Sequence, residues 1–213
     1  MQNLADIRKE YSKESLDIKT VNPDPVLQFE HWFDEALKAD IPEPTAMHLA
    51  TVNEHGRPSS RVVLLKGIER KKFVFYTNYQ SKKGKELELN PACALTFFWP
   101  DLERQIRIEG VVERVDPETS TRYFQSRPRE SQVGAWSSPQ SVMIQDRNIL
   151  EERVAQMTKK FEGYATLPRP NQWGGYRVDP MLIEFWQGRP SRLHDRIQYT
   201  KIEDSWKIHR LAP

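Results

Sequence analysis

AMHLATVNEHGRPSSRVVLLK, residues 46–66, holds two short runs that are rich in β-branched and apolar residues. The runs cover residues 46–52 and 60–66, and the turn-forming stretch EHGRP lies between them at residues 54–58. Short β-prone runs separated by Gly and Pro are typical of neighbouring strands joined by a turn. This stretch therefore predicts two antiparallel strands.

The same pattern recurs along the rest of the chain. Further strands are expected at residues 72–77, 92–99, 104–115, 173–178, 182–186, 196–201 and 206–211. Helices are expected at residues 25–37, 81–89, from 117 onward and 146–161. Many strands joined by tight turns, with few helical crossovers, predict a mainly β protein whose antiparallel sheet closes into a small barrel with flanking helices.

The N-terminal stretch differs from the rest. Residues 1–22 are polar and charged and show no apolar period, so they are expected to form a mobile arm. Residues 23–213 are expected to form a single domain, because 213 residues fit one domain of ordinary size.

Composition limits the classes of function. Lys plus Arg (32) nearly balances Asp plus Glu (30), which argues against a protein that binds nucleic acid through a strong positive field. The single cysteine, Cys93, supports neither a disulfide framework nor a cysteine metal site, and the five histidines lack metal-ligand spacing. The charged start MQNLADIRKEYSKE is unlike a secretory signal, and no apolar run has membrane-spanning length. A cytoplasmic protein without a bound metal is expected.

Several nucleotide and hydrolase signatures are absent. The sequence contains no GxGxxG after a strand, no GxxxxGK[ST], no HExxH and no GxSxG. If the protein is an enzyme, its chemistry is therefore expected to come from a cofactor that needs none of these motifs.

Cations gather beside aromatic and hydroxyl residues in four segments. In the first, RVVLLK, Arg61 and Lys66 are expected on opposite strand faces, and both could equally be solvated strand ends. In the second, FYTNYQSKKG (residues 75–84), two lysines lie near the start of a helix, where the helix dipole favours negative charge. A bound phosphate would remove that conflict, although solvated lysine pairs are also common.

The other two segments lie further along the chain. YFQSRPRES (residues 123–131) places Tyr123 and Arg127 one helical turn apart with Ser131 nearby, a set that suits a phosphate dianion. The alternative interpretation is that the segment is an irregular surface connection in which the arginine forms a salt bridge. In RLHDR, strand alternation would put Arg192, His194 and Arg196 on one face. These side chains could face an anionic ligand, or they could be charges on an edge strand that prevent its pairing with another chain.

Taken together, these segments resemble an ordered set of family motifs. RVVLLK, FYTNYQSKKG, LERQIRIEG, YFQSRPRESQVGAWSSPQS, WGGYRV, IEFWQGRPSRLHDR and WKIHRLAP are similar to motifs of the pyridoxine/pyridoxamine 5′-phosphate oxidases, from about residue 8 to residue 213. The resemblance implies an FMN-binding split β-barrel and a homodimer with FMN between the subunits. It also implies oxidation of pyridoxamine or pyridoxine 5′-phosphate to pyridoxal 5′-phosphate, with O2 reduced to H2O2.

The resemblance assigns a role to each matching position. Those implied for FMN are Arg61, Val62, Val63, Leu64, Leu65, Lys66, Tyr76, Thr77, Lys82, Lys83, Gln105, Gln140, Ser141, Trp186 and Arg196. Those implied for the substrate are Arg8, Tyr11, Lys66, Tyr123, Arg127, Ser131, Arg192 and His194. Arg192 and His194 match the pair that holds the substrate over the flavin, and residues 1–22 would close over the site. Lys82 departs from the arginine that is frequent in the family, which removes a two-pronged contact but keeps the charge.

Two other functions are consistent with such a chain. One is another split-barrel flavoprotein, such as a flavin reductase or a haem-degrading relative. The other is a non-catalytic protein that binds flavin or pyridoxal phosphate without turnover.

Overall fold

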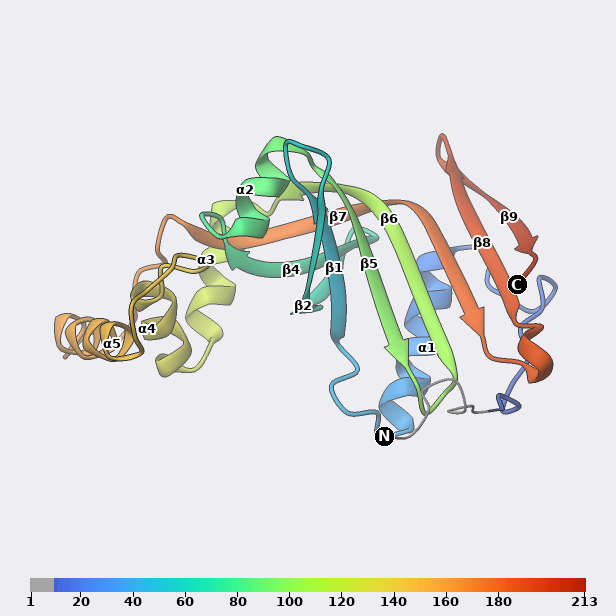
Figure 1. The fold of residues 1–213 in the computed structure, drawn as a ribbon, viewed down its shortest axis with the longest axis horizontal. Coiled ribbons are helices and arrows are strands. Elements are labelled where there is room, and N and C mark those ends of the chain that lie inside the picture. Colours follow the sequence, from blue (N-terminus) through green and yellow to red (C-terminus); the bar gives the residue numbers. More distant parts are fainter. Residues whose placement is uncertain (1–9) are drawn as a thin grey trace.

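One antiparallel sheet organises the computed structural model, which describes residues 10–213. Within this range nine strands pair in the order β2-β1-β5-β6-β7-β4-β3, and the β8–β9 hairpin extends from β7. The strands are β1 (Ala46–Val52), β2 (Pro58–Leu64), β3 (Gly67–Glu69), β4 (Lys72–Asn78), β5 (Ala92–Trp99), β6 (Arg104–Arg114), β7 (Trp173–Gln187), β8 (Asp195–Ile202) and β9 (Ser205–Leu211). The sheet curls into an open barrel, which confirms the expected β-barrel architecture (Figure 1).

Strand alternation fills the barrel. In β5, Cys93, Leu95, Phe97 and Trp99 point inward and are buried, while their neighbours along the strand are more exposed. Successive side chains of a strand point to opposite faces, so one face of each strand supplies the core. The other face of the sheet remains available for contacts outside the barrel.

Helix α1 (Pro25–Lys38) covers the core with one apolar stripe, of which Phe29 and Trp32 are buried. It begins as the sequence predicts, because Asp24 Oδ1 accepts a hydrogen bond from the Val26 amide at 2.8 Å. Helix α2 (Lys82–Leu89) has Ser81 as its N-cap, and Ser81 Oγ accepts from the Gly84 amide at 3.2 Å. The hydroxyl-rich loop before α2 is thereby fixed against the end of β4.

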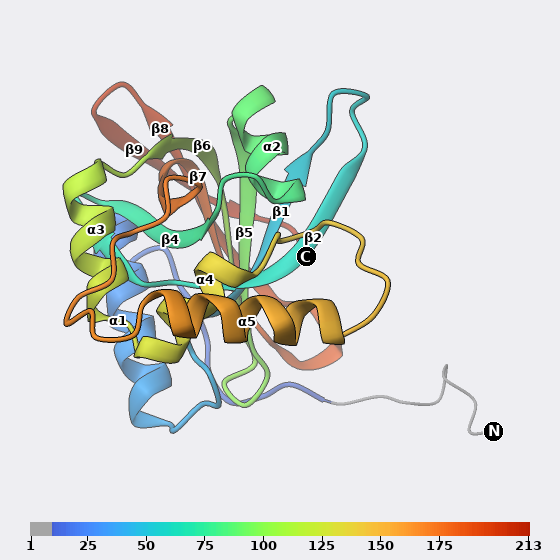
Figure 2. The same ribbon diagram turned by 90° about the vertical axis from the view of Figure 1, so that its left-hand side faces the viewer.

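Three helices gather at one end of the molecule: α3 (Pro117–Ser126), α4 (Arg129–Ser137) and α5 (Asn148–Lys160). Figure 2 shows α5 lying across this end in front of α4. A second small core forms here from Phe124, Val133, Phe161, Leu167 and Trp173. These helices therefore build a separate wall beside the N-terminal half of β7.

The structure corrects three expectations about the elements. Residues 173–187 form one strand rather than two, and residues 129–137 form a helix where an irregular connection was one reading. The expectation that Arg192, His194 and Arg196 alternate along one strand face is wrong. Arg192 ends a short 3₁₀ turn, η2 (Pro190–Arg192), with φ of 61°, and β8 begins only at Asp195.

Residues 10–22 run along the ends of β6 to β8. The amides of Ser12 and Lys13 donate to Glu103 Oε2 at 2.8 and 3.1 Å, and the Leu16 amide donates to Asp195 Oδ2 at 3.1 Å. Arg8 lies outside the described residues, and the mobility of the arm stays a prediction. Within residues 10–213 we find no helix with both the length and the apolar character required to cross a membrane.

Candidate functional site

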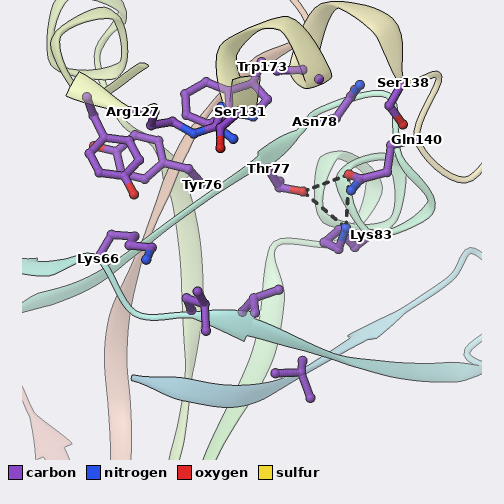
Figure 3. A pocket seen from close by; sticks show the side chains of 16 residues that line it. Lys66, Tyr76, Thr77, Asn78, Lys83, Arg127, Ser131, Ser138, Gln140 and Trp173 are labelled. Atoms are coloured by element: carbon purple, nitrogen blue, oxygen red, sulfur yellow. Dashed lines mark hydrogen bonds between the residues drawn. The ribbon is translucent and has the colours of Figure 1, made fainter. Parts of the chain in front are cut away.

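A cavity of about 490 Å³ lies between the barrel and the helical end of the molecule. Strands β2 and β4, the helices α3 and α4 and the loop after α4 contribute its walls (Figure 3). Its lining consists of Val62, Val63, Leu64, Lys66, Tyr76, Thr77, Asn78, Lys83, Tyr123, Arg127, Ser131, Gly134, Ala135, Ser138, Gln140 and Trp173. Eleven of these residues were predicted for FMN or substrate from the sequence.

The cavity is positively charged. Lys66, Lys83 and Arg127 line it, and its lining residues include no Asp or Glu. Cations that face a cavity whose lining holds no carboxylate favour the binding of an anion there. The lining therefore indicates an anionic ligand.

Arg127 has a buried hydrogen-bond donor that lacks an acceptor among the described residues. Its Nη1 atom is buried and has no hydrogen-bond partner in the described structure. The guanidinium lies 4.6 Å from the Trp173 ring centroid, and burial lowers the pKa of Arg127. A buried donor without an acceptor costs about 1–3 kcal/mol, and more when it is charged, so a phosphate or carboxylate ligand fits this position.

Flat aromatic rings form the wall next to Arg127. The rings of Tyr76 and Tyr123 stack with centroids 3.9 Å apart, and Trp173 lies parallel to Tyr76 at 5.4 Å. Burial raises the pKa of Tyr76 to about 12 and also raises the pKa of Tyr123. Both phenols are therefore neutral hydrogen-bond donors at neutral pH.

Lys83 forms a second cationic point. Its side chain is buried, and Nζ donates to Thr77 Oγ1 at 3.2 Å, Ser81 Oγ at 3.4 Å and Gln140 Oε1 at 3.3 Å. Desolvation, with the nearby charge of Arg61, lowers the pKa of Lys83. Figure 3 shows the Lys83 group and the Arg127 group on different sides of the cavity. The site thus offers two separate positions for negative charge.

Four residues predicted for FMN do not line the cavity, although each is the neighbour in sequence of a residue that does. The Arg61 guanidinium turns to Leu49 O at 3.0 Å and to Thr51 Oγ1 and Ser59 Oγ, both at 2.6 Å. Leu65 is buried in the barrel core. Lys82 is exposed, and Ser141 has a left-handed backbone with φ of 70°.

The remaining predicted residues within residues 10–213 form a second cluster where β6, β7 and β8 meet. The rings of Trp186 and His194 lie 4.6 Å apart, and Tyr11 packs edge-on to Trp186 at 5.8 Å. Gln105 pairs with Trp186 across β6 and β7, and Arg196 donates to Glu184 Oε1 at 2.8 Å. None of these residues lines the cavity, and Figure 1 shows the start of β8 at the opposite end of the sheet from α3 and α4.

His194 has a defined orientation in this cluster. The Arg189 amide donates to its Nδ1 at 3.1 Å, which leaves the proton of the neutral ring on Nε2. Desolvation and the charge of Arg192 lower the pKa of His194. Arg192 and its neighbour Ser191 both have positive φ, 61° and 55°, and such strained backbone is frequent at functional sites.

The sequence interpretation missed five lining residues: Asn78, Gly134, Ala135, Ser138 and Trp173. Each lies inside a segment that was singled out, but nothing in the local pattern showed which side chains face the cavity. Among the described residues no group of three His, Cys, Asp or Glu side chains could hold a metal ion.

Comparisons with known proteins agree with this geometry. Residues 33–161 match the family model described as pyridoxamine 5′-phosphate oxidase, and residues 173–213 match the pyridoxine 5′-phosphate oxidase C-terminal dimerisation region. The pyridoxine/pyridoxamine 5′-phosphate oxidases of Burkholderia thailandensis and Burkholderia pseudomallei are each 55% identical to this chain, with both chains fully covered.

Solved structures show the same fold. PhzG from Burkholderia lata, in complex with tetrahydrophenazine-1-carboxylic acid, has a TM-score of 0.88 at 30% identity and covers 95% of this chain and 100% of its own. A pyridoxamine 5′-phosphate oxidase-related, FMN binding protein from Nostoc punctiforme has a TM-score of 0.68 at 17% identity, with 87% and 97% covered. The split-barrel fold expected from the sequence is confirmed.

Proposed function

Because the chain belongs to the pyridoxine/pyridoxamine 5′-phosphate oxidase family, we propose that it oxidises pyridoxamine or pyridoxine 5′-phosphate to pyridoxal 5′-phosphate. FMN is the proposed cofactor and O2 the proposed electron acceptor, reduced to H2O2. The cytoplasmic location expected from the sequence stays a prediction.

One observation carries the proposal: the cavity is lined by cations without a carboxylate, and Arg127 Nη1 is buried there with no partner. A phosphate dianion would accept from Arg127, and Tyr123, Ser131 and Lys66 supply further donors around the same cavity. The phosphate is remote from the reacting carbon, so binding it positions the substrate without taking part in the chemistry.

The residues present also fit FMN. Lys83, Thr77 and Gln140 gather donors and acceptors for a second phosphate, and the strand 62–66 together with Tyr76 offers a long wall for a flat ring. A volume of about 490 Å³ is within the usual range for a cofactor site. When bound, FMN would accept the hydride and pass its electrons to O2.

We propose further that two subunits complete each site. The second cluster, with Arg192 and His194, lies away from the cavity of its own chain, and residues 173–213 match the dimerisation region of the family. In a homodimer, this cluster from one subunit would close the cavity of the other and hold the substrate against the cofactor.

Anaerobic reduction tests the function. FMN-loaded protein is mixed with pyridoxamine 5′-phosphate without air, and its flavin absorbance should bleach. Added oxygen should then restore the colour and yield H2O2. An unchanged spectrum with tight ligand binding would instead indicate a carrier, and bleaching only by a nicotinamide donor would indicate a flavin reductase. A parallel arm with a tetrahydrophenazine carboxylate tests whether the chain shares a ligand with PhzG.

A further inference from the structure

A buried carboxylate lies behind the cations that are proposed to hold the FMN phosphate. Glu86, on α2, has a side chain only 6% exposed. Its Oε2 atom accepts hydrogen bonds from Thr51 Oγ1, from Ser59 Oγ at 2.8 Å and from Arg61 Nη2 at 3.4 Å. Arg61 is thus held by Glu86 together with Leu49 O, Thr51 Oγ1 and Ser59 Oγ, none of which belongs to a residue that lines the cavity.

The second oxygen of Glu86 is unusual. Glu86 Oε1 is buried and has no hydrogen-bond partner in the described structure, and Lys82 Nζ is 4.0 Å from it. A buried ion pair that served stability alone would be expected to satisfy both oxygens, because an unsatisfied buried acceptor is costly. This half-satisfied arrangement calls for a functional explanation.

Glu86 also lies within electrostatic reach of Lys83, the cation that lines the cavity. Burial and, after it, the charge of Arg61 disfavour the protonated form of Lys83 and lower its pKa, while the charge of Glu86 acts in the opposite direction. One carboxylate therefore balances Arg61, Lys82 and Lys83 together. The family resemblance implies all three of these cations for FMN and places them near its phosphate.

We propose that Glu86 is a resident counter-anion that competes with the FMN phosphate for Arg61 and so limits the affinity for the cofactor. This inference rests on the proposed use of FMN. In the described structure the Arg61 guanidinium is turned to Glu86, Thr51 and Ser59. To contact Arg61, an incoming phosphate must draw its guanidinium away from this carboxylate, and the free energy lost with that contact weakens binding.

The proposal predicts that neutralising Glu86 tightens FMN binding. Glu86→Gln keeps an oxygen for Thr51, Ser59 and Arg61, and its amide nitrogen can occupy the place of the unpartnered Oε1. We expect the Kd of the apoprotein for FMN to fall about tenfold, because Arg61 no longer has to give up a charge-assisted contact with Glu86 before it binds the phosphate. Riboflavin, which lacks the phosphate, should bind with unchanged affinity. Both Kd values can be measured by flavin fluorescence quenching.

Glu88→Gln is the matched control. Glu88 lies on the same helix, but its side chain is 60% exposed and is paired with Arg114, so its neutralisation should leave the FMN Kd unchanged. In an Arg61→Met background the Glu86→Gln effect should disappear, because no guanidinium remains to be released. An effect of the same size in that background would overturn the proposed competition.

A wild-type measurement keeps the test decisive if Glu86→Gln does not fold. In a crystal structure of the FMN-loaded protein, Arg61 Nη2 should lie clearly farther from Glu86 Oε2 than 3.4 Å and should contact the phosphate. Arg61 remaining on Glu86, or an unchanged or higher FMN Kd in Glu86→Gln, would overturn the inference and leave the oxidase function intact. Failure of wild-type protein to bind FMN would overturn both.

Discussion

Arg127 shows how one side chain can report on a ligand. It is held over Trp173, it lies among neutral donors, and its buried Nη1 has no acceptor. Replacement by Met should raise the KM for pyridoxamine 5′-phosphate about 10- to 100-fold, because charge-assisted hydrogen bonds to a phosphate contribute about 1.5–3 kcal/mol. The kcat should change much less, since the phosphate is the same in ground and transition states.

Steady-state kinetics of Arg127→Met separates the two constants. Arg122→Met is the control, because Arg122 lies on α3 and is solvent-exposed against Glu118. A collapse of kcat with KM unchanged would contradict the role proposed for Arg127.

Replacement of Arg192 should lower kcat, whereas replacement of Arg127 should mainly raise KM. The strained backbone of Arg192 and its place beside His194 suggest that it orients the reacting end of the substrate. We expect Arg192→Met to lower kcat roughly 100-fold, the loss typical of a misplaced reactant, while FMN occupancy measured by the absorbance ratio stays near that of the wild type. Parallel loss of flavin and turnover would show a role in cofactor binding instead.

His194 predicts the acid limb of the pH profile. Its pKa is lowered, so the ring is neutral at neutral pH, and protonation of Nδ1 below the ordinary value of 6.5 breaks the hydrogen bond from the Arg189 amide. The kcat/KM should therefore be level above this pH and fall on acidification below it. The fall should be absent in His194→Gln and retained in His209→Gln, in which an exposed histidine is replaced.

At the scale of elements, local signals explain what the sequence could predict. Helices α1 and α3 begin with Asp-Pro, and both predicted caps form. The sequence predicted two strands, 173–178 and 182–186, where the structure has the single strand β7, and Pro180 lies in the interval between them. In the structure Pro180 faces Gly110 at a bulge, where a missing amide is tolerated. Helix α4 was not among the helices predicted from the sequence, and in the structure Pro128 lies just before its first residue.

The candidate site was harder to predict than its segments. Motif resemblance grouped Tyr123, Arg127 and Ser131, and the structure places all three on the wall of one cavity because they lie at one helix junction. It gave no sign that Trp173, the first residue of β7, lies under Arg127, since that contact depends on how the helical end packs on the sheet. The contact between Arg61 and Glu86 likewise depends on tertiary packing and could not be predicted from the local sequence.

The start of β7 also predicts a stability effect. A Cβ atom at Gly175 would lie 2.8 Å from Tyr76 Cε1 and 2.8 Å from Val115 Cγ2, so Gly175→Ala must displace both the Tyr76 ring, which lines the cavity, and the Val115 side chain. We expect the free energy of unfolding to fall by about 1–3 kcal/mol, the usual cost of overpacking. Gly67→Ala, on β3 with open space around it, should change it by less than about 0.5 kcal/mol in the same urea titration.

At the scale of the whole molecule, the separation between the cavity and the second cluster predicts that each active site needs residues from two subunits. Arg127 faces the cavity and Arg192 lies in the second cluster near the start of β8. If each site takes Arg127 from one subunit and Arg192 from the other, a mixed dimer of Arg127→Met and Arg192→Met subunits contains one intact site and one doubly altered site. Co-expression with two affinity tags isolates this mixed dimer.

The mixed dimer should recover roughly half of the wild-type kcat per dimer at a low, wild-type KM, because a closed two-fold dimer has two equivalent sites. Either parent dimer should show only its own defect. Such recovery would require that the substrate be held between the two subunits. It would also explain why residues 173–213, which match the dimerisation region, include strand β7, with Trp173 at its start and Trp186 near its end. Activity of the mixed dimer no higher than the mean of its parents would instead place both arginines of a site on one chain, and the proposed arrangement of the homodimer would have to be abandoned.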